Sequence, residues 1–252
     1  MKNPYRSILR SLGLSYRPIL GESSTKTIKS EKLNFLTGIL YLTPDDEICP
    51  HARLAGCMEA CLKSAGRGAF NSVQQARAAK TAFFRQHRQA FMLSLCADIW
   101  TLANKAYRLD MNPLVRPNGT SDIPWENIEA YDGKTIFQLF PDVQFYDYTK
   151  HPSRKLATKT IGNYDLTYSF SAITPKSISI KGLTNPDNKR VAVVFHKRED
   201  IPSSFRGWPV IDGDDTDVRH IEPQKVVVAL YAKGKARQDQ SGFVQIKGVH
   251  YA

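Results

Sequence analysis

The apolar residues of this chain fall into short runs separated by polar connections. The first run, Phe35–Leu42, is rich in large and β-branched residues and stops at Pro44, which predicts a buried strand. Six further runs follow, at Leu114–Arg116, Val143–Tyr146, Leu166–Tyr168, Val191–Phe195, Val210–Ile211 and Val226–Tyr231. Continuous apolar runs such as these are typical of strands that are buried on both faces, as in a parallel sheet.

Between the first and second runs the apolar period becomes helical. It predicts two helices, over Val73–Phe84 and Arg88–Leu109, and the second has an apolar stripe of Phe91, Leu95, Ile99 and Leu102. The later gaps are long enough for parallel crossovers, but several contain no helical pattern. We therefore expect an α/β fold, a barrel or partial (β/α) barrel with reduced helices in its C-terminal half. Residues 1–30 are polar and predict an N-terminal arm or surface strand, and residues 31–252 a single barrel-like domain.

Composition sets limits on the function. The 35 Lys and Arg residues exceed the 24 Asp and Glu residues, which gives a formal net charge of +11. Such a charge favours an anionic partner and permits nucleic acid, although the basic residues are spread thinly. No apolar run approaches the roughly 18 residues that cross a bilayer, and no secretory signal is evident, so we expect neither a membrane partner nor export.

Three of the four cysteines crowd into thirteen residues, as Cys49, Cys57 and Cys61 with the spacing C-x7-C-x3-C. A C-x3-C pair on a helical turn places both sulfur atoms on one face, and Gly56 frees the chain to bring Cys49 to them. Clustered thiolates favour a soft metal, either a 4Fe-4S cluster with one open iron or zinc with a fourth ligand. His51 and Cys96 are the candidates for that ligand, and three buried free cysteines are the non-metal alternative.

Polar residues follow nearly every predicted strand. Since catalytic groups of parallel α/β proteins lie at the carboxyl ends of the strands, these residues are candidates for a site beside the cysteines. Asp147, Lys150, Asp212 and Lys233 are the candidate catalytic residues. The alternative is that strands end in polar residues because loops contact water.

Several stretches of the chain resemble a bacteriophage-encoded family, the gene product 88-like family. The matching stretches are CPHARLAGCMEACLKSAGRGAF (49–70), NGTSDIPWE (118–126), LFPDVQFYDYTK (139–150), VIDGDDTDVR (210–219) and AKGKARQDQSGFV (232–244). The resemblance implies a protein in the cytoplasm of an infected bacterial host, but it implies no particular activity.

A three-cysteine loop after the first strand of a barrel also looks like the cluster site of radical S-adenosylmethionine enzymes, which use C-x3-C-x2-C. That positional resemblance implies S-adenosylmethionine as a possible cofactor. It makes Asn118, Ser121 and Asp122, together with Arg67, candidates for cofactor binding, while Asp147, Lys150 and Asp212 would line the cavity.

Two functions remain open at this point. The first is a redox or radical enzyme that uses an iron–sulfur cluster on a small-molecule or nucleotide-like substrate. The second is a non-catalytic protein, stabilised by zinc or a cluster, that binds nucleic acid or another anionic partner. A fold that has lost activity and keeps the cysteines as a clasp is a third possibility.

Overall fold

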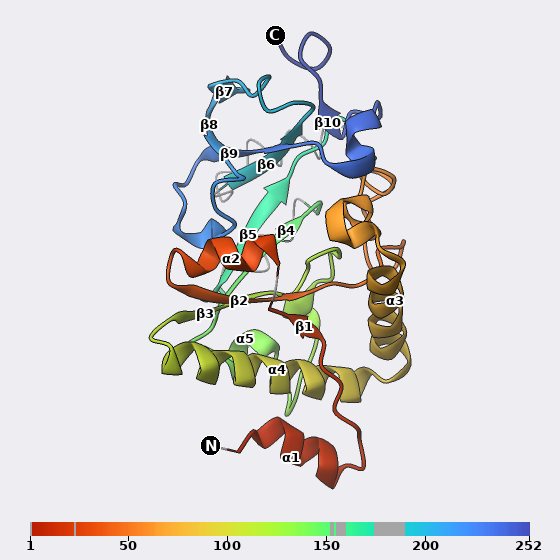
Figure 1. Cartoon of the computed structure of the whole chain (residues 1–252), viewed down its shortest axis with the longest axis vertical. Coiled ribbons are helices and arrows are strands. Elements are labelled where there is room, and N and C mark those ends of the chain that lie inside the picture. Colours follow the sequence, from red (N-terminus) through yellow and green to blue (C-terminus); the bar gives the residue numbers. More distant parts are fainter. Residues whose placement is uncertain (1, 23, 152–153, 155–159, 174–189) are drawn as a thin grey trace.

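The computed structural model describes residues 2–22, 24–151, 154, 160–173 and 190–252, and one mixed sheet forms its centre (Figure 1). The strands are β1 Leu20–Gly21, β2 Phe35–Leu40, β3 Asn112–Arg116, β4 Gln144–Thr149, β5 Tyr164–Ser169, β6 Arg190–Phe195, β7 Ser204–Phe205, β8 Trp208–Asp212, β9 Val226–Tyr231 and β10 Val244–Gln245. The helices are α1 Pro4–Ser11, α2 Thr25–Glu31, α3 Asn71–Gln86, α4 Arg88–Arg108 and α5 Ile136–Leu139. All seven predicted strands and both predicted helices are confirmed.

The strand order explains how the carboxyl ends of the strands come together. Neighbouring strands run parallel through β2-β3-β4-β5-β6-β9-β8, while β1 and β7 are short antiparallel strands at the two edges. Strand β10 pairs with the end of β6, beyond the residues that pair with β5. Because seven neighbouring strands are parallel, their carboxyl ends lie at one edge of the sheet.

The order from β2 to β6 is that of a (β/α) barrel, but the sheet does not close. In the described part of the chain, β9 is inserted between β6 and β8, and no strand pairs the β7 edge with the β1 edge. The predicted barrel is therefore not confirmed, and the architecture is an open, mixed α/β sheet with few helices. The loop after β8 contacts side chains of β3 and β4 on the inner face of the sheet.

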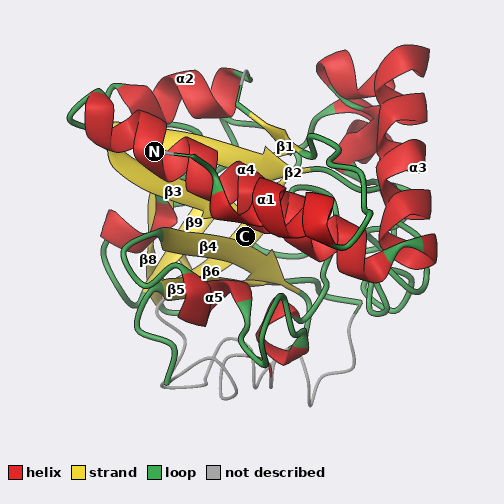
Figure 2. Cartoon of the chain, turned by 90° about the horizontal axis from the view of Figure 1, so that it is seen from below, coloured by secondary structure: helices red, strands yellow, loops and turns green. Residues whose placement is uncertain are grey.

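Apolar side chains pack on the outer face, under α4. The predicted stripe of α4 is buried in this core, with Phe91, Leu95 and Ile99 at 0% exposure. Leu36, Val115 and Phe145 of the sheet pack against the same core. Figure 2 shows α4 and α1 stacked over the sheet, so the layer is two helices deep on this side.

Charged side chains fill the inner face. Arg116 of β3 forms a buried ion pair with Asp217 (3.5 Å), and the Tyr146 hydroxyl of β4 donates to the same carboxylate (2.9 Å). The Arg219 guanidinium donates to the Tyr148 hydroxyl at 2.6 Å. The loop that carries Asp217 and Arg219 follows β8, far from β3 and β4 in the strand order. These contacts therefore require a curved sheet whose inside is filled by protein rather than by a cavity.

The first thirty residues contain helices and a short strand. Within the described residues of this segment, α1, β1 and α2 form, and Leu9 and Ile19 are buried in the main core at 1% exposure. Asn3 caps α1 and donates to the Ala97 carbonyl of α4 at 2.8 Å. In the described part of the chain, no helix combines the length and apolarity that crossing a bilayer requires.

Candidate functional site

The cysteine segment, residues 44–61, lies over the edge where the parallel strands end. The Asp122 backbone N–H, in the loop after β3, donates to the Ile48 carbonyl at 2.9 Å. The Ser171 hydroxyl, just after β5, donates to the Ala55 carbonyl at 2.7 Å. The segment is therefore tied to two strand-end loops, in the region where catalytic groups of parallel α/β proteins occur.

The segment consists of turns, and its glycine is required by geometry. Gly56 has φ of +69°, and a Cβ atom at this position would collide with the Ser241 hydroxyl. The Cys57 N–H bonds to the Ala52 carbonyl at 3.0 Å and closes the turn that Gly56 permits. Cys61 has extended backbone angles, so the helical turn that we expected for the C-x3-C pair ends before its second cysteine.

The three thiols are partly buried and close enough to influence one another. Cys49 packs against the main core and points its Sγ towards the Thr120 carbonyl (3.8 Å), whereas Cys57 packs against the C-terminal residues Ala232 and Phe243. Burial raises the pKa of each thiol; charge on Cys61 would raise the pKa of Cys49 and of Cys57 further.

The three thiols lie in one segment of the chain, but they do not form a complete metal coordination sphere. Among the described residues, no group of three or more His, Cys, Asp or Glu side chains is positioned to hold a metal ion. The fourth cysteine, Cys96, lies in the core under α4 at 0% exposure, and burial raises its pKa to about 12. A metal at this rim would therefore have to draw the turns of the cysteine segment together.

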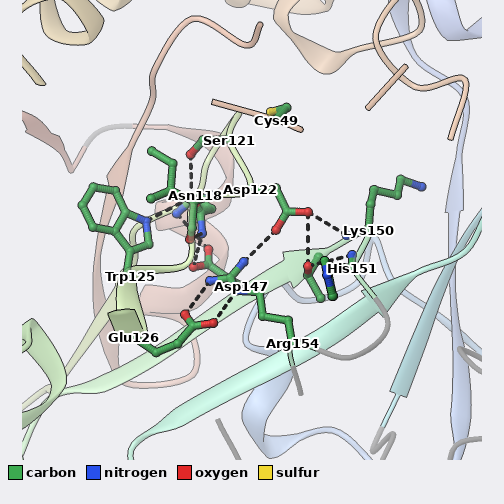
Figure 3. Close-up of polar contacts among 12 residues, drawn as sticks. Cys49, Asn118, Ser121, Asp122, Trp125, Glu126, Asp147, Lys150, His151 and Arg154 are labelled. Atoms are coloured by element: carbon green, nitrogen blue, oxygen red, sulfur yellow. Dashed lines mark hydrogen bonds and ion pairs between the residues drawn. The ribbon is translucent and has the colours of Figure 1, made fainter. Parts of the chain in front are cut away.

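Beneath the segment lies a polar group that we call the Asn118 network: Asn118, Ser121, Asp122, Trp125, Glu126, Asp147 and Arg154 (Figure 3). The Asn118 amide group donates to Asp147 Oδ2 (2.9 Å) and to the Ile123 carbonyl (3.0 Å). Its Oδ1 accepts from the Ser121 hydroxyl, the Ile123 N–H and the Trp125 indole N–H. Asn118 thus has every hydrogen-bonding position occupied within the protein, and it shapes the loop after β3.

Arg154 joins the carboxylates of this network. Its guanidinium forms ion pairs with Asp122 (2.6 Å) and Glu126 (2.8 Å), and all three side chains are less than a tenth exposed. Asp122 also accepts from the Lys150 N–H at 2.8 Å, so the network holds the end of β4 in place. Three of the predicted site residues, Asn118, Ser121 and Asp122, are therefore brought together with their hydrogen bonds satisfied.

Asp147 is the most deeply buried carboxylate of the network. It accepts from the Asn118 N–H (2.8 Å), the Asn118 amide group and the Tyr164 hydroxyl (3.0 Å). Burial raises the pKa of Asp147 to about 7, although the Arg154 charge and these donors act in the opposite direction. Its proton equilibrium therefore falls near neutral pH.

Comparison with known protein families identifies the kinship of the chain. The gene product 88 family model matches residues 18–247. The chain belongs to the gene product 88 family. No curated protein and no solved structure matches it. The match covers the cysteine segment, the Asn118 network and the sheet of this gene product 88 protein, so all of them lie within the family region.

Cationic side chains flank the cysteines of this family member on two sides. The Lys150 ammonium donates to the Phe170 carbonyl (3.0 Å) and lies 4.3 Å from the centre of the Phe243 ring. Burial lowers the pKa of Lys150 to about 8, and the charge of Lys150 in turn favours the thiolate of Cys57. Lys63 and Arg77 act on Cys61 in the same way.

The remaining predicted residues lie apart from the Asn118 network. Asp212, at the end of β8, pairs with the exposed Arg198 (2.6 Å), and Lys233 pairs with Asp214 (2.6 Å). Arg67 is exposed in the short turn Gly66–Ala69. The structure thus brings Asp147 and Lys150 to the rim near the cysteines, while Asp212 and Lys233 make their contacts with other residues.

Sequence reasoning missed two side chains at this rim. The His151 ring meets the His51 ring edge to face, with centroids 4.6 Å apart, directly after Lys150. Arg77 lies on α3 with its guanidinium over the Tyr41 ring, and its charge favours the thiolate of Cys61. His151 follows a predicted strand end and could have been noticed there, but nothing in the helical pattern of α3 marks Arg77.

Proposed function

We propose that this protein binds an iron–sulfur cluster on Cys49, Cys57 and Cys61 and uses it as a redox or radical-type enzyme. The observation that supports the proposal is the position of the three cysteines in a segment that lies over the carboxyl rim of a parallel sheet, where the charge of Cys61 influences the pKa of Cys49 and of Cys57. The donor set fits, because thiolates are the ligands that iron–sulfur clusters take and three of them leave one iron of a cubane open.

The charges around the thiols support a metal centre. Forming three thiolates in a partly buried site needs positive charge nearby, and the charges of Lys150 and Lys63 lower the pKa of Cys57 and of Cys61 respectively. When bound, such a cluster supplies one-electron transfer through its irons. The residues of this chain would hold it, screen it from water and fix the loops around it.

Each candidate residue has a role under this proposal. The Asn118 network keeps the loop after β3 rigid beneath the cysteine segment. The Asp122 carboxylate positions Lys150 by accepting a hydrogen bond from the Lys150 backbone N–H. Asp147, with a pKa of about 7, and Lys150, with a pKa of about 8, are two groups near this rim whose protons exchange near neutral pH. Because protein fills the inner face, a substrate would bind over the rim.

Anaerobic reconstitution with iron and sulfide tests the proposal. The wild-type protein should take up both and gain the broad visible absorption of thiolate-ligated clusters, whereas Cys57→Ser should take up much less. Cys96→Ser is the matched control, because that thiol lies in the core and should be dispensable for iron. A pure wild-type sample that holds neither iron nor sulfide would contradict the proposal.

Added S-adenosylmethionine then tests the finer radical-type reading. If it binds the open iron, the electron paramagnetic resonance spectrum of the reduced cluster should change. An unchanged spectrum would remove S-adenosylmethionine and leave a redox function. Uptake of zinc in place of iron would instead favour the metal-stabilised binding protein, for which the net charge of +11 predicts anion binding that weakens with salt.

A further inference from the structure

Two stretches of the chain that lack acidic residues meet at the carboxyl rim. Between Glu59 and Asp98 the sequence contains six Lys and Arg residues and neither Asp nor Glu. The stretch 232–238, which reads AKGKARQ, contains three Lys and Arg residues and likewise no acid. The short 3-10 helix Leu62–Ser64 packs against the short 3-10 helix Gly234–Gln238, the orange and blue turns in Figure 1. Although the basic residues are spread thinly along the sequence, the fold therefore gathers positive charge where these two turns meet.

The cations at this place are accessible and are not neutralised by carboxylates. Arg67 and Arg237 are exposed, and Lys63 is half-buried. Within the part of the chain that the structure describes, none of these three side chains forms an ion pair. Asp239, the first acidic residue after the second turn, accepts hydrogen bonds from its own loop at 2.8 Å and 2.9 Å. The positive charge is therefore available to an anionic partner.

An exposed aromatic ring lies at the same place. Phe70 follows Arg67 by three residues, and its N–H bonds to the Arg67 carbonyl at 3.2 Å, so one turn carries both the guanidinium and the ring. Phe70 is 60% exposed, and no other phenylalanine of the described residues is exposed to that extent. Helix α3 begins here without a side-chain cap and without an acidic residue in its first turn, so the positive end of its dipole adds to the charge. We call the following residues the rim surface: Lys63, Arg67, Phe70 and Arg237.

We propose that the rim surface binds single-stranded nucleic acid. The inference goes beyond the proposed function and uses none of the three cysteines. A phosphodiester chain presents a negative charge at every nucleotide, which matches cations that are spread over two neighbouring turns. The bases of a single strand are free to stack on an exposed ring such as Phe70, whereas the bases of a duplex are already paired and stacked. A single strand therefore fits both the charge and the ring.

Fluorescence anisotropy of the full chain with a labelled thymidine oligomer of about twelve nucleotides tests the inference. The wild type should bind, and the logarithm of its Kd should rise linearly with the logarithm of the salt concentration. Arg67→Gln and Arg237→Gln should each lower that slope by about 0.7, as expected for the loss of one phosphate contact with a single strand. Phe70→Leu should instead raise the Kd by about fivefold at an unchanged slope, because it removes base stacking but no charge. A uridine oligomer in the same assay distinguishes RNA from DNA, and binding of either supports the inference.

The control is Arg10→Gln, which removes one exposed charge from α1, at the other end of the molecule (Figure 1). It should leave the Kd within about twofold of the wild type and the salt slope unchanged. If Arg10→Gln weakens binding as much as Arg67→Gln does, binding follows net charge alone and the rim surface is overturned as its site. An unchanged Kd for Phe70→Leu, or equally strong competition by duplex DNA or polyglutamate, would overturn a single strand as the occupant.

A wild-type protein that binds neither oligomer would overturn the inference outright. That result would leave the proposed iron–sulfur function standing, because the rim surface contains no cysteine. Conversely, a protein that takes up no iron could still bind the oligomer with the expected variant effects, so the two proposals fail separately.

Discussion

Two buried polar groups lie under the cysteine segment, and they differ in whether their hydrogen bonds are complete. In the Asn118 network, Asn118 uses its whole amide and Arg154 pairs with two carboxylates. On α3, Arg77 keeps two nitrogen atoms without a hydrogen-bond partner among the described residues. Both groups are shielded from water, so the contrast does not come from solvent exposure.

The contrast separates side chains that stabilise the fold from side chains that could still bind a ligand. A complete network gains stability from every bond and has nothing left to offer a ligand, so it fixes the loops that carry the site. An incomplete group costs stability in the free protein and gains it when its partner arrives. We therefore interpret the Asn118 network as a structural element that fixes the loops beneath the cysteine segment.

The largest effect should come from breaking the complete network. Asn118→Ala leaves the Asp147 carboxylate, the Trp125 indole and the Ser121 hydroxyl without the partner they share, all in a buried place. We expect the free energy of unfolding to fall by about 5 kcal/mol in a denaturant titration.

Asn104→Ala on α4 is the matched control for that substitution. Among the described residues its side chain makes one hydrogen bond, to the Trp100 carbonyl at 2.8 Å, and its loss should cost about 1 kcal/mol or less. Equal losses in the two variants would mean that the Asn118 network contributes no more than a single surface bond.

A second, somewhat smaller effect concerns the proton of Asp147. The pKa of Asp147 is about 7 in the folded protein, whereas that of an exposed carboxyl is 3.8. Between these two pH values, the folded protein therefore keeps a proton that the unfolded chain has lost. The stabilisation is fully present below about pH 4, is lost as the pH rises to 7, and amounts to at most about 4 kcal/mol.

Unfolding titrations from pH 4 to 8 measure this effect, with Asp147→Asn as the comparison. The variant has no proton to lose, so the difference between its stability and that of the wild type should change with pH and become constant above pH 7. A difference that is independent of pH would show that Asp147 stays ionised throughout this range.

The sheet could be predicted from the sequence because burial on both faces leaves a local mark. Runs such as Val191–Phe195 and Val226–Tyr231 are continuous apolar stretches, and both form central strands. Closure of the sheet leaves no such mark. It depends on β9 pairing between β6 and β8, and on a loop after β8 that fills the inside through Asp217 and Arg219.

The candidate site, too, could be predicted only where its features are local in the sequence. The cysteines and the polar residues at strand ends are visible as spacings along the chain, and the structure brings Asn118, Ser121 and Asp122 into one network. Whether those groups are satisfied or free depends on partners far away in sequence, such as Asp147 for Asn118. In the same way, the sequence could not show that Nε and Nη1 of Arg77 lack hydrogen-bond partners among the described residues.

The smallest predicted effect concerns the two cationic sides of the cysteine segment. Lys150 favours the thiolate of Cys57, whereas Lys63 and Arg77 favour that of Cys61. In the metal-free protein, Lys150→Gln should slow alkylation of Cys57 by about threefold, as expected for one charge acting across a partly hydrated rim. Lys63→Gln should slow alkylation of Cys61 instead.

Fragment-ion mass spectrometry after brief treatment with iodoacetamide measures alkylation of the two cysteines separately. Equal slowing of both cysteines by Lys150→Gln would contradict a division of the rim into two sides. A thiolate forms most readily where positive charge lies nearby, so the cysteine that loses reactivity in each variant identifies which cation favours which thiolate.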